Sequence, residues 1–234
     1  MPDEQPGTAL AVVAHPDDVE FNMGGTVALW IAQGWRVVYA IVTAGDKGSA
    51  DPTVTPAQLA ATREREQREA AAFLGAAGVE FLGYEDGGLE PSLAVRRDIA
   101  RQIRRHRPNR LLVTDPAELF SARYIQHPDH IAAAQAALAA TFAARDRLTM
   151  PELLAEGLEP HGVAEVWVET GRDPDVFVDI TPVMEKKKQA LRLHASQIEE
   201  GFLAIMEAIA RETAARAPDP RPQFAESYRV VRLG

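Results

Sequence analysis

Histidine, proline and aspartate occur in the same order at two places in this 234-residue sequence. The first, AHPDDVEFNMGGT at residues 14–26, follows a run of small apolar residues, and the second is HPDH at residues 127–130. Imidazole nitrogen and carboxylate oxygen are ligands that zinc takes in proteins. The sequence has no cysteine, so a metal ion here would be held by nitrogen and oxygen alone.

The spacing within each motif suits chelation of one ion. His15 and Asp18 lie three residues apart across a proline turn, so both could bind the same metal. Pro128 suits the first position of a helix, which would put His127 and His130 an i,i+3 step apart, facing roughly the same way. Either of these histidines could supply the third ligand, and the residues alone leave that choice open.

The remaining groups of the two motifs fit the roles of a base and an acid. Asp17 would be a carboxylate beside the metal without being needed on it, so it could take a proton from water, whose pKa zinc lowers to about 7. The histidine that is not a ligand could give a proton to a leaving group. Together these residues predict a metal-dependent hydrolase.

Other interpretations of the same residues are structural or belong to other enzyme classes. HPDD alone could cap a helix, and HPDH could be a capped helix start with surface histidines. Gly24-Gly25 and the loop AGDKGS at residues 44–49 suggest a phosphate cradle, yet neither matches a nucleotide-binding glycine motif. The glycine pair is better explained by close approach of a helix to the sheet. No G-x-S-x-G motif indicates a serine hydrolase.

Composition limits the class of protein. The length predicts one domain spanning residues 1–234, with room for a large core. A net charge of -9 argues against a nucleic-acid partner, and we interpret the basic residues 101–110 as a solvated helix face. The sequence has no apolar run of about 18 residues, so it predicts no membrane span. We expect a cytoplasmic protein.

The hydrophobic pattern alternates strands and helices, which predicts an α/β fold with a mostly parallel sheet covered on both faces. The expected strands are residues 10–14, 36–43, 79–82, 110–114, 163–169, 176–180 and 227–233. The expected helices are residues 24–33, 56–74, 93–106, 131–145, 182–194 and 197–215.

The polar loops follow strands. HPDD follows the first strand, AGDKGS the second, and the loop ending in HPDH the fourth. Ligands bind beyond the carboxyl ends of the strands in such sheets. If the first strand lies between the second and the fourth, all three loops meet at one site.

These residues also resemble a known family. AHPDDVEFNMGGT is similar to the first signature of the LmbE-like (PIG-L) zinc-dependent de-N-acetylases, and HPDH to the second. The helix pattern at residues 63–75, the loop AGDKGS and the segment ALRLHASQ at residues 190–197 resemble further parts of that family. The likeness runs from about residue 10 to about residue 200, and the two motifs in this order are highly specific. It implies a Rossmann-like fold of three αβα layers.

The resemblance assigns roles to the motif residues. It implies His15, Asp18 and His130 as zinc ligands, which chooses His130 over His127. It implies Asp17 as the general base, and His127 as a general acid or a group that polarises the carbonyl. Asp129 would orient or tune His127.

The resemblance also suggests three substrate-binding residues: Asp46, Arg63 and His194. A salt bridge from Arg63 to Glu66 within the helix, or a structural role for a buried His194, explains these two residues equally well. Family members that act in mycothiol biosynthesis resemble one another in a Tyr-Gly pair before HPDH, where this chain has Ile125 and Gln126. A tyrosine-assisted oxyanion role and a mycothiol-type substrate are therefore not carried over. The loop LFSARYIQ at residues 119–126 would shape the substrate pocket.

The predicted function is zinc-dependent hydrolysis of the N-acetyl group of an amino sugar of the N-acetylglucosamine type, which releases acetate and an amine. Two alternatives remain: a metal-dependent hydrolase of a different amide or ester, and a non-catalytic sugar-binding module. The metal could also be another divalent ion such as Fe²⁺. The expected partner is a small N-acetylated sugar, and a homo-oligomer is possible by analogy with the family.

Overall fold

A computed structural model describes residues 5–120, 124–170 and 172–233. Its centre is a seven-stranded sheet with the order β3-β2-β1-β4-β5-β7-β6. The strands are β1 (Thr8–Val13), β2 (Arg36–Thr43), β3 (Gly78–Tyr84), β4 (Arg110–Thr114), β5 (Glu165–Glu169), β6 (Val176–Asp179) and β7 (Ala225–Arg232). The first five strands are parallel, and β7 runs antiparallel to both β5 and β6.

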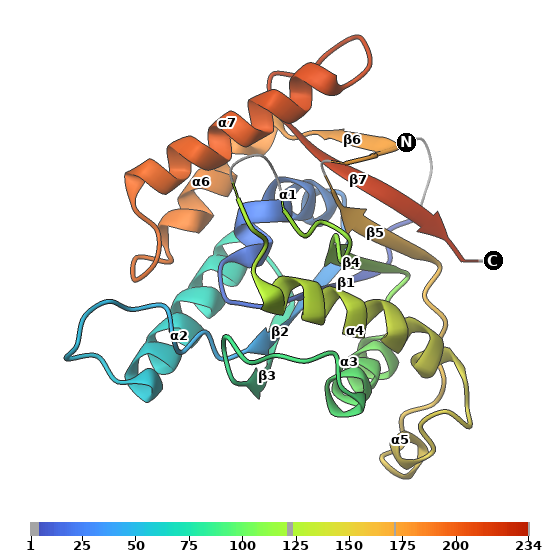
Figure 1. Cartoon of the computed structure of the whole chain (residues 1–234). Coiled ribbons are helices and arrows are strands. Elements are labelled where there is room, and N and C mark those ends of the chain that lie inside the picture. The colour runs from blue at the N-terminus through green and yellow to red at the C-terminus, as the bar shows by residue number, and fades with distance from the viewer. Residues whose placement is uncertain (1–4, 121–123, 171, 234) are drawn as a thin grey trace.

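Helices cover both faces of this sheet (Figure 1). They are α1 (Gly24–Ala32), α2 (Pro56–Leu74), α3 (Leu93–His106), α4 (Pro128–Arg145), α5 (Glu152–Ala155), α6 (Met184–Arg192) and α7 (Glu200–Arg216). Buried side chains of α3, α4 and α5 pack with one sheet face, and those of α1, α2 and α6 with the other. α7 packs against α6 and the β6–β7 edge. The predicted three-layer α/β fold is confirmed.

The central strand β1 explains why the sequence there is uniformly apolar. It pairs with β2 on one side and β4 on the other, and both of its faces are covered. Residues 9–13 are therefore almost fully buried on either face, so they do not alternate with polar residues. This arrangement is the one that brings the three polar loops together.

The long helix α2 begins and ends where its sequence predicts. Thr55 and Gln58 form a reciprocal capping box, and Pro56 occupies the first turn. Gly75 ends the helix with a φ of +97°, a left-handed conformation that glycine adopts without steric cost. Local residues thus fix both ends of the helix.

Three features of the fold differ from the sequence prediction. A π-helical turn, Val19–Met23, precedes α1, and the short helix α5 was not predicted. The basic segment 101–110 is not only a solvated face, because Arg104 is buried. Its guanidinium donates to the carbonyls of Ala143, Ala144 and Asp146, which closes the end of α4.

Candidate metal centre and active site

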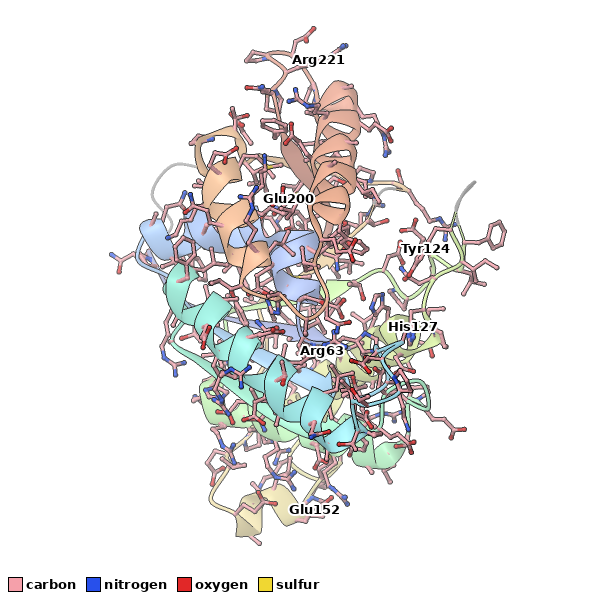
Figure 2. All side chains as sticks on the ribbon, turned by 90° about the vertical axis from the view of Figure 1, so that its left-hand side faces the viewer. Arg63, Tyr124, His127, Glu152, Glu200 and Arg221 are labelled. Carbon is pink, nitrogen blue, oxygen red and sulfur yellow. The ribbon has the colours of Figure 1, made fainter. Side chains whose placement is uncertain are left out.

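The site lies at the carboxyl ends of β1 to β4. Because β1 lies between β2 and β4, the loops after these strands meet there, as the sequence predicted. The loop after β3 joins them through Asp86, which is buried. Figure 2 shows Arg63 on α2 and His127 at the start of α4 on the same side of the molecule.

Three side chains form a compact triangle of ligand atoms. His15 Nδ1 lies 3.1 Å from His130 Nε2, and His130 Nε2 lies 3.1 Å from Asp18 Oδ1. His15 Nδ1 lies 3.7 Å from Asp18 Oδ2. Two ligand atoms bound tetrahedrally to one zinc ion at about 2.0–2.1 Å lie roughly 3.3 Å apart. The triangle fits an ion of this kind. An ion held by these three ligands would have a fourth tetrahedral position for water or substrate.

A second group of possible ligands, His15, His127 and Asp129, shares one histidine with the first. Asp129 is already engaged, because its carboxylate accepts the backbone amides of Gly87 at 2.7 Å and Leu89 at 3.2 Å. It also lies 3.5 Å from His15 Nε2. The geometry therefore favours His130 over His127 as the third ligand, as the family resemblance implies.

Carboxylates on its far side orient the ring of His15. His15 Nε2 lies 3.0 Å from Asp86 Oδ1, which leaves Nδ1 facing the triangle. Burial lowers the pKa of His15, but hydrogen bonds to Asp129, Asp18 and Asp86 outweigh it and raise the pKa to about 11. A carboxylate behind a ligand histidine fixes the ring orientation and makes it a better donor. Asp86 thus orients a residue of the candidate metal site, although sequence reasoning missed it.

Asp17 stands beside the triangle without belonging to it. Its carboxylate accepts a hydrogen bond of 3.1 Å from the Arg63 guanidinium. Burial raises the pKa of Asp17 to about 6, and the nearby charge of Arg63 opposes part of this rise. A carboxyl group with a pKa near neutrality is suited to accept and release a proton. The role of Asp17 as a base stays a prediction.

Arg63 joins the two loops that flank the site. Its buried guanidinium also donates to the carbonyls of Pro16 at 2.7 Å and Gly45 at 3.0 Å. A Cβ at Gly45 would lie 2.8 Å from this guanidinium, so only glycine permits the approach. The alternative salt bridge to Glu66 is wrong: Glu66 instead accepts bonds from the amide and hydroxyl of Ser196.

His127 and Asp129 are linked through the backbone. His127 caps α4, and its Nδ1 accepts the Asp129 amide at 3.2 Å, so the proton of the neutral ring is on Nε2. The ring contacts that of His15 edge-on, with centroids 4.7 Å apart. Burial lowers the pKa of His127, and the His15 charge adds to the shift. Asp129 therefore orients His127 by its amide, while its carboxylate holds His15 and the β3 loop.

The other two predicted substrate-binding residues bond to residues that surround the site. Asp46 accepts the Asp86 amide at 3.1 Å, which holds the loop that carries Asp86. His194 is fully buried, and its Nε2 lies 3.2 Å from Glu20. Substrate contact by either residue stays a prediction.

Two further polar residues escaped sequence reasoning. Gln67 accepts the Asp17 amide, and Gln126 lies 2.9 Å from His130 Nδ1. Gln67 could have been found, because it follows Arg63 by one helical turn on the same face. Gln126 lies in an irregular loop, where spacing predicts no orientation.

The glycine pair at the start of α1 serves packing. Glu226 of β7 accepts the amides of Gly25 at 2.8 Å and Thr26 at 2.7 Å. A Cβ at Gly25 would lie 2.9 Å from this carboxylate. The protein's own carboxylate therefore occupies the helix N-terminus that the phosphate interpretation would need, and the predicted close approach is correct.

The loop before α4 is only partly described, because residues 121–123 lie outside the described residues. Tyr124 and Ile125 are exposed, at 56% and 81%. Figure 2 shows Tyr124 on this loop, near His127. The predicted role of the loop in shaping the pocket stays a prediction.

Comparison with known proteins identifies the family. The sequence profile of the GlcNAc-PI de-N-acetylases (PIG-L) matches residues 10–141, which is more than half of the chain. The chain belongs to the PIG-L family. The resemblance based on the two motifs is therefore confirmed.

Relatives of this PIG-L protein are named deacetylases. It is 34% identical to a diacetylchitobiose deacetylase of Thermococcus kodakarensis, over 88% of this chain and 75% of the relative. It is 29% identical to a 1D-myo-inositol 2-acetamido-2-deoxy-alpha-D-glucopyranoside deacetylase of Catenulispora acidiphila, over 87% of this chain and 80% of the relative. The family members named here act on small molecules that contain N-acetylglucosamine.

Solved structures show the same fold. The N,N'-diacetylchitobiose deacetylase of Pyrococcus horikoshii matches with a TM-score of 0.88 and 28% identity, over 96% of this chain and 84% of that chain. A 4-carboxy-2-hydroxymuconate hydratase of Pseudomonas putida matches with a TM-score of 0.80 and 24% identity, over 97% of both chains. The second match shows the fold alone. No helix within the described residues has the length and apolar character needed to cross a membrane.

Proposed function

We propose that this protein is a zinc-dependent de-N-acetylase that hydrolyses the N-acetyl group of a small amino sugar of the N-acetylglucosamine type. The observation that carries the proposal is the triangle of His15 Nδ1, Asp18 and His130 Nε2, with Asp17 and His127 close to it. Metal-dependent hydrolysis of an amide requires a set of metal ligands, a base and an acid, and all of these lie together at the carboxyl ends of the strands.

His15, Asp18 and His130 would hold the ion. When bound, zinc supplies Lewis acidity, which polarises a carbonyl and lowers the pKa of water. Two nitrogens and one carboxylate oxygen match the donor set of a catalytic zinc site with an open position. Fe²⁺ would accept the same donors, so the native metal needs a direct test.

Asp17 would accept a proton from the attacking water. The hydroxyl adds to the acetyl carbon, and the bond from that carbon to nitrogen then breaks. His127, with its proton on Nε2, would protonate the departing nitrogen, which releases acetate and the free amine. Arg63 would keep the Asp17 carboxylate near the triangle through their 3.1 Å hydrogen bond.

The two named substrates of the relatives suggest the first compounds to test. Ile125 and Gln126 replace the Tyr-Gly pair of mycothiol-type members, so we expect N,N'-diacetylchitobiose or N-acetylglucosamine to be better substrates than the inositol conjugate.

The test is acetate release from these three compounds by protein reconstituted with Zn²⁺ or Fe²⁺, before and after treatment with a chelator. The proposal expects release that the chelator abolishes and added metal restores. Release that survives complete metal removal would contradict the metal-dependent mechanism. Cleavage of simple amides or esters with no release from any sugar would support the alternative hydrolase, and binding of sugar without cleavage would support the non-catalytic module.

A further inference from the structure

The backbone at Asp17 has an unusual conformation. Its φ is +87°, in the left-handed region that residues with a side chain adopt at an energetic cost. The direction of its carboxylate depends on this backbone conformation. The groups that hold the peptide therefore also determine where the proposed base points.

Gln67 of α2 holds that peptide by a hydrogen bond. It is fully buried, and its Oε1 accepts the Asp17 amide at 2.9 Å. An amide side chain can turn over and exchange its oxygen for its nitrogen, and the bond to Asp17 needs the oxygen. Something else must therefore fix the orientation of Gln67.

Glu20 provides that orientation. Gln67 Nε2 donates to both carboxylate oxygens of Glu20, each at 3.1 Å. An ionised carboxylate can only accept hydrogen bonds, so the Gln67 nitrogen must face Glu20 and its oxygen must face Asp17. The π-helical turn Val19–Met23 carries Glu20 inward, next to α2.

His194, in the segment after α6, is the third residue of the arrangement. Glu20 and His194 are both fully buried, and His194 Nε2 lies 3.2 Å from Glu20 Oε2. Burial lowers the pKa of His194, but the hydrogen bond to Glu20 outweighs it and raises the pKa. A buried carboxylate without partners is costly, and here His194 and Gln67 both donate to it.

We propose that Gln67, Glu20 and His194 form a positioning chain that holds Asp17 in its catalytic conformation. The proposal rests on the proposed function, since it assigns Asp17 as the base. The three residues are fully buried and lie outside the metal triangle, so we propose that they act through the Asp17 peptide. They lie far apart in the sequence and meet only through packing of the π-helical turn, α2 and the segment after α6.

The first experiment compares Gln67→Leu with Gln102→Leu in zinc-loaded protein. Gln102 is a matched control, because it is also a buried helical glutamine but lies in α3, on the other face of the sheet. With N,N'-diacetylchitobiose, Gln67→Leu should lower kcat about 100-fold, as misplacement of a catalytic group by about 1 Å does. Its KM and zinc content should match those of the wild type, and Gln102→Leu should keep kcat.

A second readout does not depend on activity. Hydrogen exchange of the Asp17 amide, followed by NMR, should be at least about 10-fold faster in Gln67→Leu, because its acceptor is gone. The Val42 amide in β2 should exchange as in the wild type. An unchanged exchange rate at Asp17 would overturn the proposal even if the wild type shows no deacetylase activity.

An exchange of the two side chains keeps the test valid if Gln67→Leu does not fold. Gln67→Glu alone would set two carboxylates against each other, so we expect kcat to fall about 100-fold. In the double variant E20Q/Q67E, the new amide donates to the new carboxylate, which still accepts the Asp17 amide. The double variant should recover to within about 10-fold of the wild-type kcat.

The outcomes separate the positioning chain from the proposed function. Absence of acetate release by the wild type contradicts the proposed function, and amide exchange at Asp17 then decides the positioning role. A folded, active wild type with an equally active Gln67→Leu overturns the positioning chain alone. A double variant no better than Gln67→Glu would also overturn it, because rescue is what the reciprocal bonds require.

Discussion

The two His-Pro-Asp stretches have the same residue types but different backbones. In the first, Asp17 has a left-handed φ of +87°, and a π-helical turn follows at Val19–Met23. In the second, Pro128 begins the regular helix α4, with His127 as its cap. The irregular backbone presents Asp17 to the site, whereas the regular helix turns Asp129 inward to the backbone amides of the β3 loop.

The histidines differ in the same way. His15 is buried, with its Nε2 facing the carboxylates of Asp86 and Asp129, whereas His127 is half-buried and its Nδ1 accepts the Asp129 amide. A ligand must stay fixed in direction, and a proton donor must reach the substrate. The comparison teaches that the surroundings of each histidine, rather than the tripeptide, distinguish the proposed metal ligand from the proposed proton donor.

The largest expected effect comes from the first histidine. His15→Ala should lose the metal and at least about 1000-fold in kcat, because the ion supplies several kcal/mol of transition-state stabilisation. Metal content after dialysis and acetate release measure this. His161→Ala is the control, since the ring of this half-buried histidine bonds to the Pro108 carbonyl and lies outside the triangle. Full zinc content in His15→Ala would contradict the role of His15 as a metal ligand.

The next effect separates the two adjacent aspartates of the first stretch. Asp17→Asn should keep the metal and lose about 100- to 10,000-fold in kcat, because the amide cannot accept the proton of the water. Asp18→Asn should lose metal, since it weakens the triangle. Wild-type turnover in Asp17→Asn would contradict its role as a base.

A smaller effect is expected at Asp129 of the second stretch. Asp129→Asn leaves one acceptor for the amides of Gly87 and Leu89 and for His15, so it should cost about 1–3 kcal/mol of stability. Metal affinity should weaken about 10- to 100-fold. Metal titration and thermal unfolding measure both quantities. Asp115→Asn, in the loop after β4, should lower stability without changing metal affinity. A metal affinity of Asp129→Asn equal to that of the wild type would contradict the supporting role of Asp129.

The smallest effect concerns Glu169 at the carboxyl end of β5, which has no histidine partner among the residues that the structure describes. Burial raises the pKa of Glu169 to about 8, and Glu118 and Glu226 add to the rise. Because its folded pKa exceeds the unfolded value near 4.5, its contribution to stability is lost as pH rises from about 4.5 to about 8. Glu169→Gln should match the wild-type Tm at pH 4 and exceed it at pH 9, by about 2–4 °C for each kcal/mol of stability recovered. A higher wild-type Tm at pH 9 would contradict this sign.

Most elements of the fold could be predicted because their signals are local. The capping box at Thr55, the left-handed Gly75 and the apolar run of β1 each define an element from a few residues. The insertion of β7 between β5 and β6 could not be predicted, because it depends on pairing between distant strands. The buried Arg104 was missed because the carbonyls that it binds lie on another helix.

The sequence by itself determined the chemistry of this protein. It specified the two motifs, the donor atoms, the strand ends that carry them and the family to which they belong. The tertiary structure decided which atoms meet: Nδ1 of His15 in the triangle, Asp86 and Asp129 behind it, and Gln67 beneath Asp17. Residue types and spacing are local properties of the chain. Contacts across strands and helices arise only when the core packs, because packing sets the distance and direction of each side chain.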